Sequence, residues 1–213
     1  MQLTEIRVAG FGGQGVILSA ILLGKAASIY EGAYATMTQN FGPEARGGAC
    51  SAQLVLSGSP ILYPYVTKLD ILVAMSQEAY VRFVPELKEG GILIVEQDLV
   101  RVSDLNKEVQ VYSVPATRIA EELGKRMVLN SVMVGFFTAV TRLLDAEAVR
   151  NAVVDSVPPS FLKLNLTAFE KGLEYGAIAL AAPVSEANAD LQLEYSPESF
   201  LQEPFRTPNT GRA

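Results

Sequence analysis

The first stretch whose residue types suggest chemistry is a glycine loop at residues 8–16, which reads Val-Ala-Gly-Phe-Gly-Gly-Gln-Gly-Val. It contains the spacing G-x-G-x-x-G as Gly10, Gly12 and Gly15, directly after an apolar run that predicts a strand. Glycine lets the backbone turn tightly and approach a ligand closely, and the free N–H groups of a following helix favour an anion. The loop therefore predicts a phosphate-binding turn. A tight strand-to-helix turn that holds no ligand is the alternative.

The same spacing is typical of dinucleotide-binding folds, but a second element of such sites is missing. Selectivity for NAD requires an Asp or Glu about 20 residues further on, at the end of the second strand, where it holds the ribose hydroxyls. Here the predicted second strand, Tyr34 to Gln39, ends without an acid, and Glu31 lies before it. A free-standing NAD(P)- or FAD-binding oxidoreductase therefore stays only as an alternative.

A second loop that could contact a ligand spans residues 40–48 and reads Asn-Phe-Gly-Pro-Glu-Ala-Arg-Gly-Gly. Arg46 offers a planar guanidinium that suits phosphate or carboxylate. In an open α/β sheet this loop would follow the carboxyl end of the second strand, as the glycine loop follows the first, and ligands bind at that edge. We expect both loops to contribute to one site. The alternative is a solvated hairpin loop in which Arg46 only pairs with Glu44.

Composition excludes several kinds of chemistry. The 213 residues include no histidine and one cysteine, Cys50. The usual zinc and histidine-base chemistries are therefore absent, as is a self-contained iron–sulfur cluster, which needs about four thiolates. We expect no catalytic residue and no metal ligand in this chain, and we expect Cys50 to be a small buried apolar residue. The net charge of −6, without a block of Lys or Arg, indicates no nucleic-acid partner.

The sequence shows no signal for export or for a membrane. Met1 to Glu5 lead directly into a predicted strand, without the basic segment and apolar core of a signal peptide. The most apolar predicted helical segment, Val132 to Val140, is far shorter than the roughly 20 residues that span a bilayer. We expect a cytoplasmic protein that contacts no membrane.

Predicted strands and helices alternate along most of the chain, and this alternation is typical of an α/β domain. The patterns predict strands at residues 3–9, 34–39, 50–56, 70–75, 92–95 and 109–114. They predict helices at residues 16–30, 78–87, 116–123, 130–144, 146–153 and 160–175. The loop between the second and third strands is too short for a helical crossover, so those strands should be antiparallel. We expect a three-layer, Rossmann-like fold with a mixed, mostly parallel sheet and helices on both faces.

The composition changes near the end of the chain. Residues 1–180 are predicted to form one domain, and residues 181–213 an acidic tail that contains proline. From Pro183 onward there are four prolines, five acids and two arginines, which give a net charge of −3. The segment is either a poorly ordered tail or an extended arm that packs on another surface through its scattered apolar residues.

Three segments together resemble the gamma subunit of 2-oxoacid:ferredoxin oxidoreductases, and the 2-oxoglutarate type is the most similar. They are the glycine loop, the loop at residues 41–48 and the sequence Leu-Asn-Ser-Val-Met-Val-Gly at residues 129–135. Ser57 to Ile61 also fits the family. The two unusual loops occur in the right order and at the right distance, and the resemblance covers roughly Leu3 to Ala179.

The resemblance implies an accessory role in a larger enzyme. In this family a thiamine diphosphate enzyme decarboxylates a 2-oxo acid, passes electrons through iron–sulfur clusters to ferredoxin and forms an acyl-coenzyme A. Thiamine diphosphate, magnesium and the clusters would lie on alpha, beta and, where present, delta partner subunits. This chain would contribute to the coenzyme A site and be inactive in isolation. A purely structural subunit whose loops touch no cofactor is a further alternative.

The resemblance carries the coenzyme-binding role to individual positions. The residues that match the family's binding positions are Gly12, Gly13, Gln14, Gly15, Val16, Arg46, Asn130 and Asn165. The match at Arg46 is looser, because the surrounding residues differ. Asn130 could instead cap the long apolar helix that follows it, or do both, and Asn165 could bond only to a neighbouring backbone group. We expect Gly135, inside that helix, to allow close packing.

Overall fold

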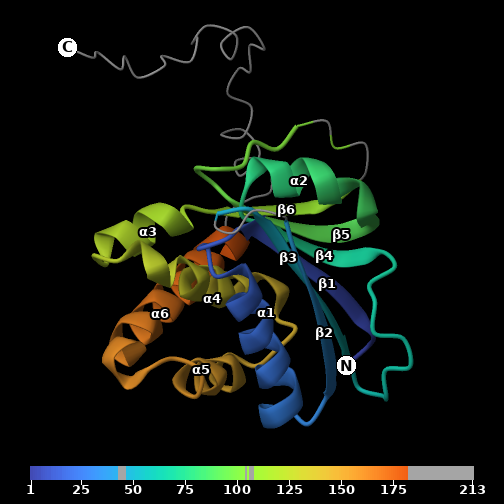
Figure 1. Ribbon diagram of the computed structural model, residues 1–213, viewed down its shortest axis with the longest axis horizontal. Helices are drawn as coiled ribbons and strands as arrows, with labels where there is room; N and C mark the ends of the chain where they lie inside the picture. Colours follow the sequence, from blue (N-terminus) through green and yellow to red (C-terminus); the bar gives the residue numbers. More distant parts are fainter. Residues whose placement is uncertain (43–46, 104, 106–107, 182–213) are drawn as a thin grey trace, which may run out of the picture.

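A computed structural model describes residues 1–42, 47–103, 105 and 108–181 of the chain. Within these residues, six strands pair into a single sheet in the spatial order β2-β3-β1-β4-β5-β6 (Figure 1). The strands are β1 (Thr4–Phe11), β2 (Tyr34–Phe41), β3 (Ala49–Ser57), β4 (Leu69–Ala74), β5 (Leu87–Glu96) and β6 (Gln110–Val114).

The helices of the described residues follow the predicted alternation with strands. They are α1 (Val16–Lys25), α2 (Gln77–Phe83), α3 (Ala116–Glu122), α4 (Leu129–Thr141), α5 (Ala146–Val154) and α6 (Pro159–Ala181). Three shorter turns accompany them: the π-helix η1 (Ala26–Tyr30) and the 3₁₀ turns η2 (Val84–Glu86) and η3 (Arg126–Val128).

The sheet is mixed, as predicted. β1, β4, β5 and β6 pair in parallel, whereas β3 is antiparallel to both of its neighbours, β1 and β2. Because β3 lies antiparallel between them, β1 and β2 run in the same direction. Their carboxyl ends, and the two loops that follow them, therefore lie at the same edge of the sheet.

The sheet separates two apolar cores. Figure 1 shows α2 on one face of the sheet and α1, α4, α5 and α6 on the other. The larger core joins the second group of helices to the sheet and includes the buried Phe136, Phe137 and Phe169. The smaller core lies under α2 and includes Tyr80 and Phe83. This arrangement confirms the predicted α/β fold with helices on both faces.

Two predicted boundaries in the middle of the chain are wrong. The predicted helix at residues 78–87 ends at Phe83, because Pro85 cannot continue the α-helical hydrogen bonds, and η2 leads from there into β5. β5 begins at Leu87, five residues before the predicted strand. Gly90 and Gly91 lie within this strand, and Gly90 has a φ of 73° beside a register irregularity.

The C-terminal helices also differ from their predicted bounds. α4 begins at Leu129 and ends at Thr141, where Arg142 adopts a left-handed conformation with a φ of 50°. α6 extends from Pro159 to Ala181, beyond the predicted end at Tyr175. The tail prediction for residues 182–213 concerns residues outside those that the structure describes.

α4 and α6 pack closely because small residues line their contact. A Cβ atom at Gly135 would collide with the backbone oxygen of Phe169 on α6. A Cβ atom at Gly172 would collide with the backbone oxygen of Val132 and lie 2.8 Å from the nitrogen of Phe136. The prediction that Gly135 allows close packing is confirmed. This contact fixes the position of α4, whose first turn contributes to the candidate site described below.

We expect Gly172→Ala to lower the free energy of unfolding by about 1–3 kcal/mol, because the added methyl must separate two backbones in a packed interior. Gly24→Ala is the matched control, since a Cβ there would meet only the end of the flexible Leu54 side chain at 3.3 Å, and alanine favours the helix. Urea unfolding of both variants measures the difference. Equal stabilities of the two variants would show that the α4–α6 contact is not tight.

Candidate functional site

The glycine loop leaves the beginning of α1 open to a ligand. Gly13 and Gly15 have φ angles of 95° and 74°, a region that favours glycine. Gly15 occupies the N-cap position, where it offers no side-chain acceptor, and the first turn of α1 contains no acidic residue. A Cβ atom at Gly13 would meet no atom of the described residues within 4 Å. The free N–H groups and the positive end of the helix dipole at this end of α1 therefore suit an anion.

The second loop lies directly against the first, as predicted. The backbone nitrogen of Gly12 donates a hydrogen bond to the oxygen of Gly48, with an N–O distance of 2.8 Å. A Cβ atom at Gly12 would lie 3.3 Å from the nitrogen of Gly47, so the contact leaves little room for a side chain. Arg46, the predicted basic ligand contact, is outside the described residues.

Two predicted contact residues of the loop use their side chains within the protein. The amide of Gln14 accepts a hydrogen bond from the nitrogen of Phe11 at 2.6 Å and donates one to the oxygen of Met75 at 2.7 Å. Val16 is buried in the larger core. Gln14 therefore stabilises the loop conformation through its side chain and also through its backbone N–H, which donates to the oxygen of Phe11 at 3.2 Å. Val16 anchors α1 to the sheet, and its backbone N–H, in the first turn of α1, is left to face a ligand.

Asn130 lies beneath the glycine loop. A Cβ atom at Gly15 would be 2.5 Å from the Cβ of Asn130, so the two residues are in close contact. The Asn130 side chain is buried, and its Nδ2 has no hydrogen-bond partner. The prediction that it caps the helix is wrong: α4 begins one residue earlier, its N-cap is Val128, and no side chain caps it. The unpartnered Nδ2 lies next to the glycine loop, where a ligand bound to the loop would be close to it.

Asn165 has a different environment. Its Oδ1 accepts a hydrogen bond from the hydroxyl of Ser131 at 2.7 Å, and its Nδ2 donates to the oxygen of Phe161 at 2.9 Å. These bonds connect α6 to the first turn of α4 and satisfy the buried amide. The proposed alternative, a bond to neighbouring backbone, is confirmed for Nδ2. The bond to Ser131 was not predicted.

A cavity of about 620 Å³, here called the loop cavity, opens beside the glycine loop. Its lining is largely apolar and contains one arginine; it consists of Phe11, Gly12, Gly13, Gln14, Ser76, Gln77, Glu78, Leu99, Arg126, Met127 and Leu129. Arg126 is exposed and forms no ion pair with any described residue. Sequence analysis missed it, although the adjacent Lys125 and Arg126 precede Asn130 by only a few residues.

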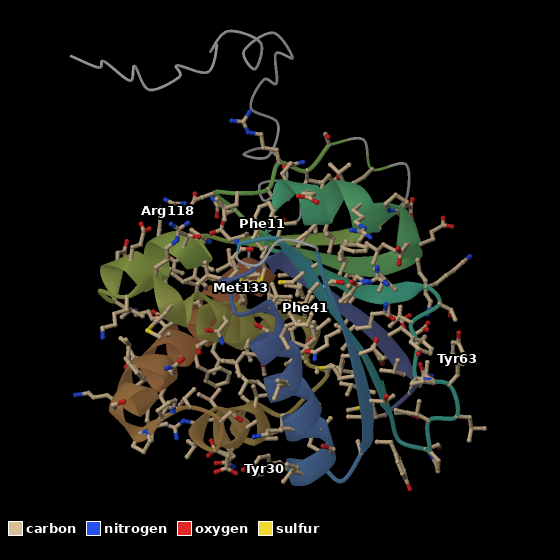
Figure 2. The ribbon with its side chains drawn as sticks, viewed as in Figure 1. Phe11, Tyr30, Phe41, Tyr63, Arg118 and Met133 are labelled. Carbon is tan, nitrogen blue, oxygen red and sulfur yellow. The ribbon has the colours of Figure 1, made fainter. Side chains whose placement is uncertain are left out.

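A second cavity of about 220 Å³, here called the α2 cavity, lies between α2 and the ends of β2 and β3. It is lined by Gly10, Asn40, Phe41, Gly42, Ala49, Cys50, Ser51, Ser76, Glu78, Ala79, Arg82 and Phe83. Ser76 and Glu78 line both cavities. Phe11 and Phe41, labelled in Figure 2, are the last residues of β1 and β2 at this edge.

Cys50 lines the α2 cavity with a thiol of low reactivity. The residue is buried and forms no disulfide, as expected for the lone cysteine. Burial raises the pKa of its thiol, so the reactive thiolate is disfavoured. Within the ranges that the structure describes, no group of three or more Cys, Asp or Glu side chains is placed to hold a metal ion. The site therefore offers binding groups, with backbone amides and arginines as its positive elements.

The fold and the two contacting loops can now be compared with known proteins. The sequence profile of the pyruvate ferredoxin/flavodoxin oxidoreductase family matches residues 5–175. The chain belongs to this family. The predicted resemblance to gamma-type subunits of 2-oxoacid:ferredoxin oxidoreductases is confirmed. The prediction that the chain is a subunit of an oxidoreductase is confirmed as well.

Individual relatives agree with this assignment. A 2-oxoglutarate synthase subunit, KorC, from Methanothermobacter thermautotrophicus is 50% identical over 176 residues, which cover 80% of this chain and 93% of the relative. The gamma subunit of a keto/oxoacid ferredoxin oxidoreductase from Geobacter sulfurreducens has a crystal structure with a TM-score of 0.76 and 36% identity. That match covers 84% of this chain and 99% of the other.

A third protein shares the fold at lower identity. It is a 2-oxoglutarate:ferredoxin oxidoreductase from Magnetococcus marinus, solved with 2-oxoglutarate, coenzyme A and succinyl-CoA bound. Its TM-score is 0.75 at 23% identity, and the match covers 84% of this chain and 32% of the other. In the described part of our chain, no helix is long and apolar enough to cross a membrane.

The two buried asparagines generate a matched test. We expect Asn165→Ala to lower the free energy of unfolding by about 1–3 kcal/mol, because it removes two hydrogen bonds and leaves the Ser131 hydroxyl without a partner. Asn130→Ala should cost less, because the amide that it removes has an unpartnered Nδ2. Thermal or urea unfolding of both variants measures the order. A larger loss for Asn130→Ala would mean that its amide is already satisfied within the fold.

Proposed function

We propose that this chain is the coenzyme A-holding gamma subunit of a 2-oxoglutarate:ferredoxin or related acceptor oxidoreductase. The observation that carries the proposal is the space at Gly13, beside the uncapped start of α1. The backbone there has a φ of 95°, and none of the residues that the structure describes fills the space. Such a surface binds an anion through backbone amides and needs no side chain. The diphosphate of coenzyme A has the charge and the shape that this surface suits.

The surroundings of the glycine loop fit the rest of such a ligand. Arg126 brings a positive charge to the rim of the loop cavity, where it can pair with a phosphate. Leu99, Met127 and Leu129 give the same cavity an apolar lining that suits the pantetheine arm. Gly13, Gly15 and Val16 would contact the phosphates through their backbone N–H groups. The N–H of Gly12 is bonded to the oxygen of Gly48, so Gly12 would support the loop, as Gln14 and Asn130 do. Arg46 stays a proposed contact from the second loop.

The sheet topology argues against the dinucleotide alternative. In a dinucleotide-binding sheet, the strand that carries the ribose-binding acid is parallel to the first strand and adjacent to it. Here the antiparallel β3 lies between β1 and β2. β2 also ends with Gln39, Asn40 and Phe41, none of which is acidic. The position from which an acid would hold the ribose of NAD is therefore not available on this strand.

The composition of the chain indicates that partner subunits carry the redox groups. With one cysteine and no histidine, it cannot ligate an iron–sulfur cluster alone. Thiamine diphosphate, magnesium and the clusters would belong to alpha, beta and, where present, delta subunits, and ferredoxin would receive electrons from the complex. 2-Oxoglutarate is the proposed substrate because the relative at 50% identity is named a 2-oxoglutarate synthase subunit. Our chain would bind and orient coenzyme A so that its thiol reaches the acyl group on a partner.

Gly13→Leu tests this role. The added side chain would occupy the proposed phosphate position, so we expect the coenzyme A concentration needed for half-maximal activity of the assembled complex to rise at least about tenfold. Decarboxylation that does not depend on coenzyme A should persist. Gly32→Leu is the matched control, because Gly32 also has a positive φ, 67°, and open space, but it lies between η1 and β2.

Steady-state kinetics of the complexes that carry either variant measure both activities. An equal loss of coenzyme-dependent and coenzyme-independent activity in Gly13→Leu would contradict a specific role in coenzyme binding. Unchanged kinetics in that variant would favour a purely structural subunit.

A further inference from the structure

The α2 cavity is separate from the first turn of α1 and has polar groups that the proposed phosphate cradle does not use. We propose that it binds the 3′-phosphoadenosine end of coenzyme A, and that Arg82 contacts the 3′-phosphate. This inference rests on the proposed coenzyme A role and adds an orientation to it. The adenosine would lie on the α2 side of the glycine loop, the diphosphate at the loop, and the pantetheine arm in the loop cavity.

Among the described residues that line the α2 cavity, Arg82 carries a positive charge and Glu78 a negative one. Arg82 is exposed and forms no ion pair with any described residue. Its guanidinium carbon lies 5.2 Å from the centre of the Phe83 ring, and that of Arg7 lies 4.2 Å from the same ring. Glu86 pairs with Arg7 at 3.1 Å. Glu86 is thus engaged by Arg7, whereas Arg82 has no ion-pair partner among the described residues, so the Arg82 guanidinium is available to an anion.

The buried Arg7 is affected by the positive charge of Arg82. Burial lowers the pKa of its guanidinium, and the nearby positive charge of Arg82 lowers it further, against the opposing effect of Glu86. The Nε of Arg7 is buried without a hydrogen-bond partner. A dianionic phosphate at Arg82 would offset the repulsion between the two guanidinium groups.

Neutral polar and aromatic groups line the rest of the α2 cavity. Ser51 is only 6% exposed, and its hydroxyl has no partner among the described residues although it lines the cavity. Asn40 lies opposite Ser51 in the β2–β3 register and is exposed at the cavity. Phe41 and Phe83 add aromatic surface. Together they offer stacking surface and hydrogen bonds for a purine, a ligand that is flat and has a polar edge.

The two cavities are connected closely enough for one elongated ligand. Ser76 and Glu78 line both of them, and Gly10 of the α2 cavity and Gly12 of the loop cavity belong to the same loop. The Glu78 carboxylate could accept hydrogen bonds from a ribose hydroxyl or the adenine amino group. The diphosphate of coenzyme A lies between its adenosine and its pantetheine arm, which matches the order α2 cavity, glycine loop and loop cavity.

Coenzyme A and dephospho-coenzyme A, which lacks only the 3′-phosphate, test the orientation. The full chain, purified with the subunits that accompany it, is titrated with each compound by calorimetry. We expect the wild type to bind coenzyme A roughly tenfold more tightly, because a charge-assisted contact is lost with the phosphate. Arg82→Gln should abolish this preference by weakening coenzyme A alone. Arg150→Gln, a surface control on α5 whose arginine pairs with Glu170, should keep it.

The possible results separate the orientation from the proposed function. Loss of the preference in Arg126→Gln, with retention in Arg82→Gln, would overturn the inference and place the adenosine in the loop cavity. Equal binding of both compounds by the wild type would also overturn it, while leaving the coenzyme A role intact. Binding of neither compound would contradict the coenzyme A role itself. An equal weakening of both compounds in Arg82→Gln would show that Arg82 acts on the fold and not on the 3′-phosphate.

Discussion

The site depends on the antiparallel position of β3 between β1 and β2. Because β3 is antiparallel to both of its neighbours, β1 and β2 run in the same direction and end at the same edge of the sheet. The glycine loop and the second loop then meet, and Gly12 bonds to Gly48. A Rossmann order, with β2 next to β1, would instead place a strand end for ribose recognition beside the loop. The same glycine spacing thus occurs here in a different strand arrangement.

The helical layer supplies the second half of this arrangement. Glycines on α4 and α6 let the two backbones approach, and the approach holds the first turn of α4 under the glycine loop. Asn130 then contacts Gly15 from below, and η3 brings Arg126 to the rim of the loop cavity. Gln14 fixes the loop from within through the backbone of Phe11 and Met75. Packing of apolar and small residues therefore sets the positions of the polar groups at the site.

The sequence was sufficient to predict the fold class, the mixed sheet and the meeting of the two loops, because glycine spacing and strand periodicity are local signals. It was not sufficient for features that depend on three-dimensional contacts. The predicted strand began only at Ile92, yet β4 pairs with Leu87 before Gly90 and Gly91 and with Ile92 after them, so both glycines lie inside β5. Asn130 resembled a cap, yet η3 shifts the start of the helix. Arg82 was not singled out from the sequence, because only the fold places its guanidinium and that of Arg7 against the same Phe83 ring.

The central claim is that backbone amides of the glycine loop hold a phosphate-bearing coenzyme while the redox groups lie on partner subunits. Hydrogen–deuterium exchange of the purified complex, with and without saturating coenzyme A, tests it most directly, because a bound phosphate slows the exchange of the amides that contact it. We expect protection of Gly13 and of residues 15–17 by coenzyme A and none by NAD, because the N–H groups of Phe11, Gly12 and Gln14 are already bonded within the protein. Protection by NAD, or unchanged exchange throughout this loop when coenzyme A is bound, would contradict the account.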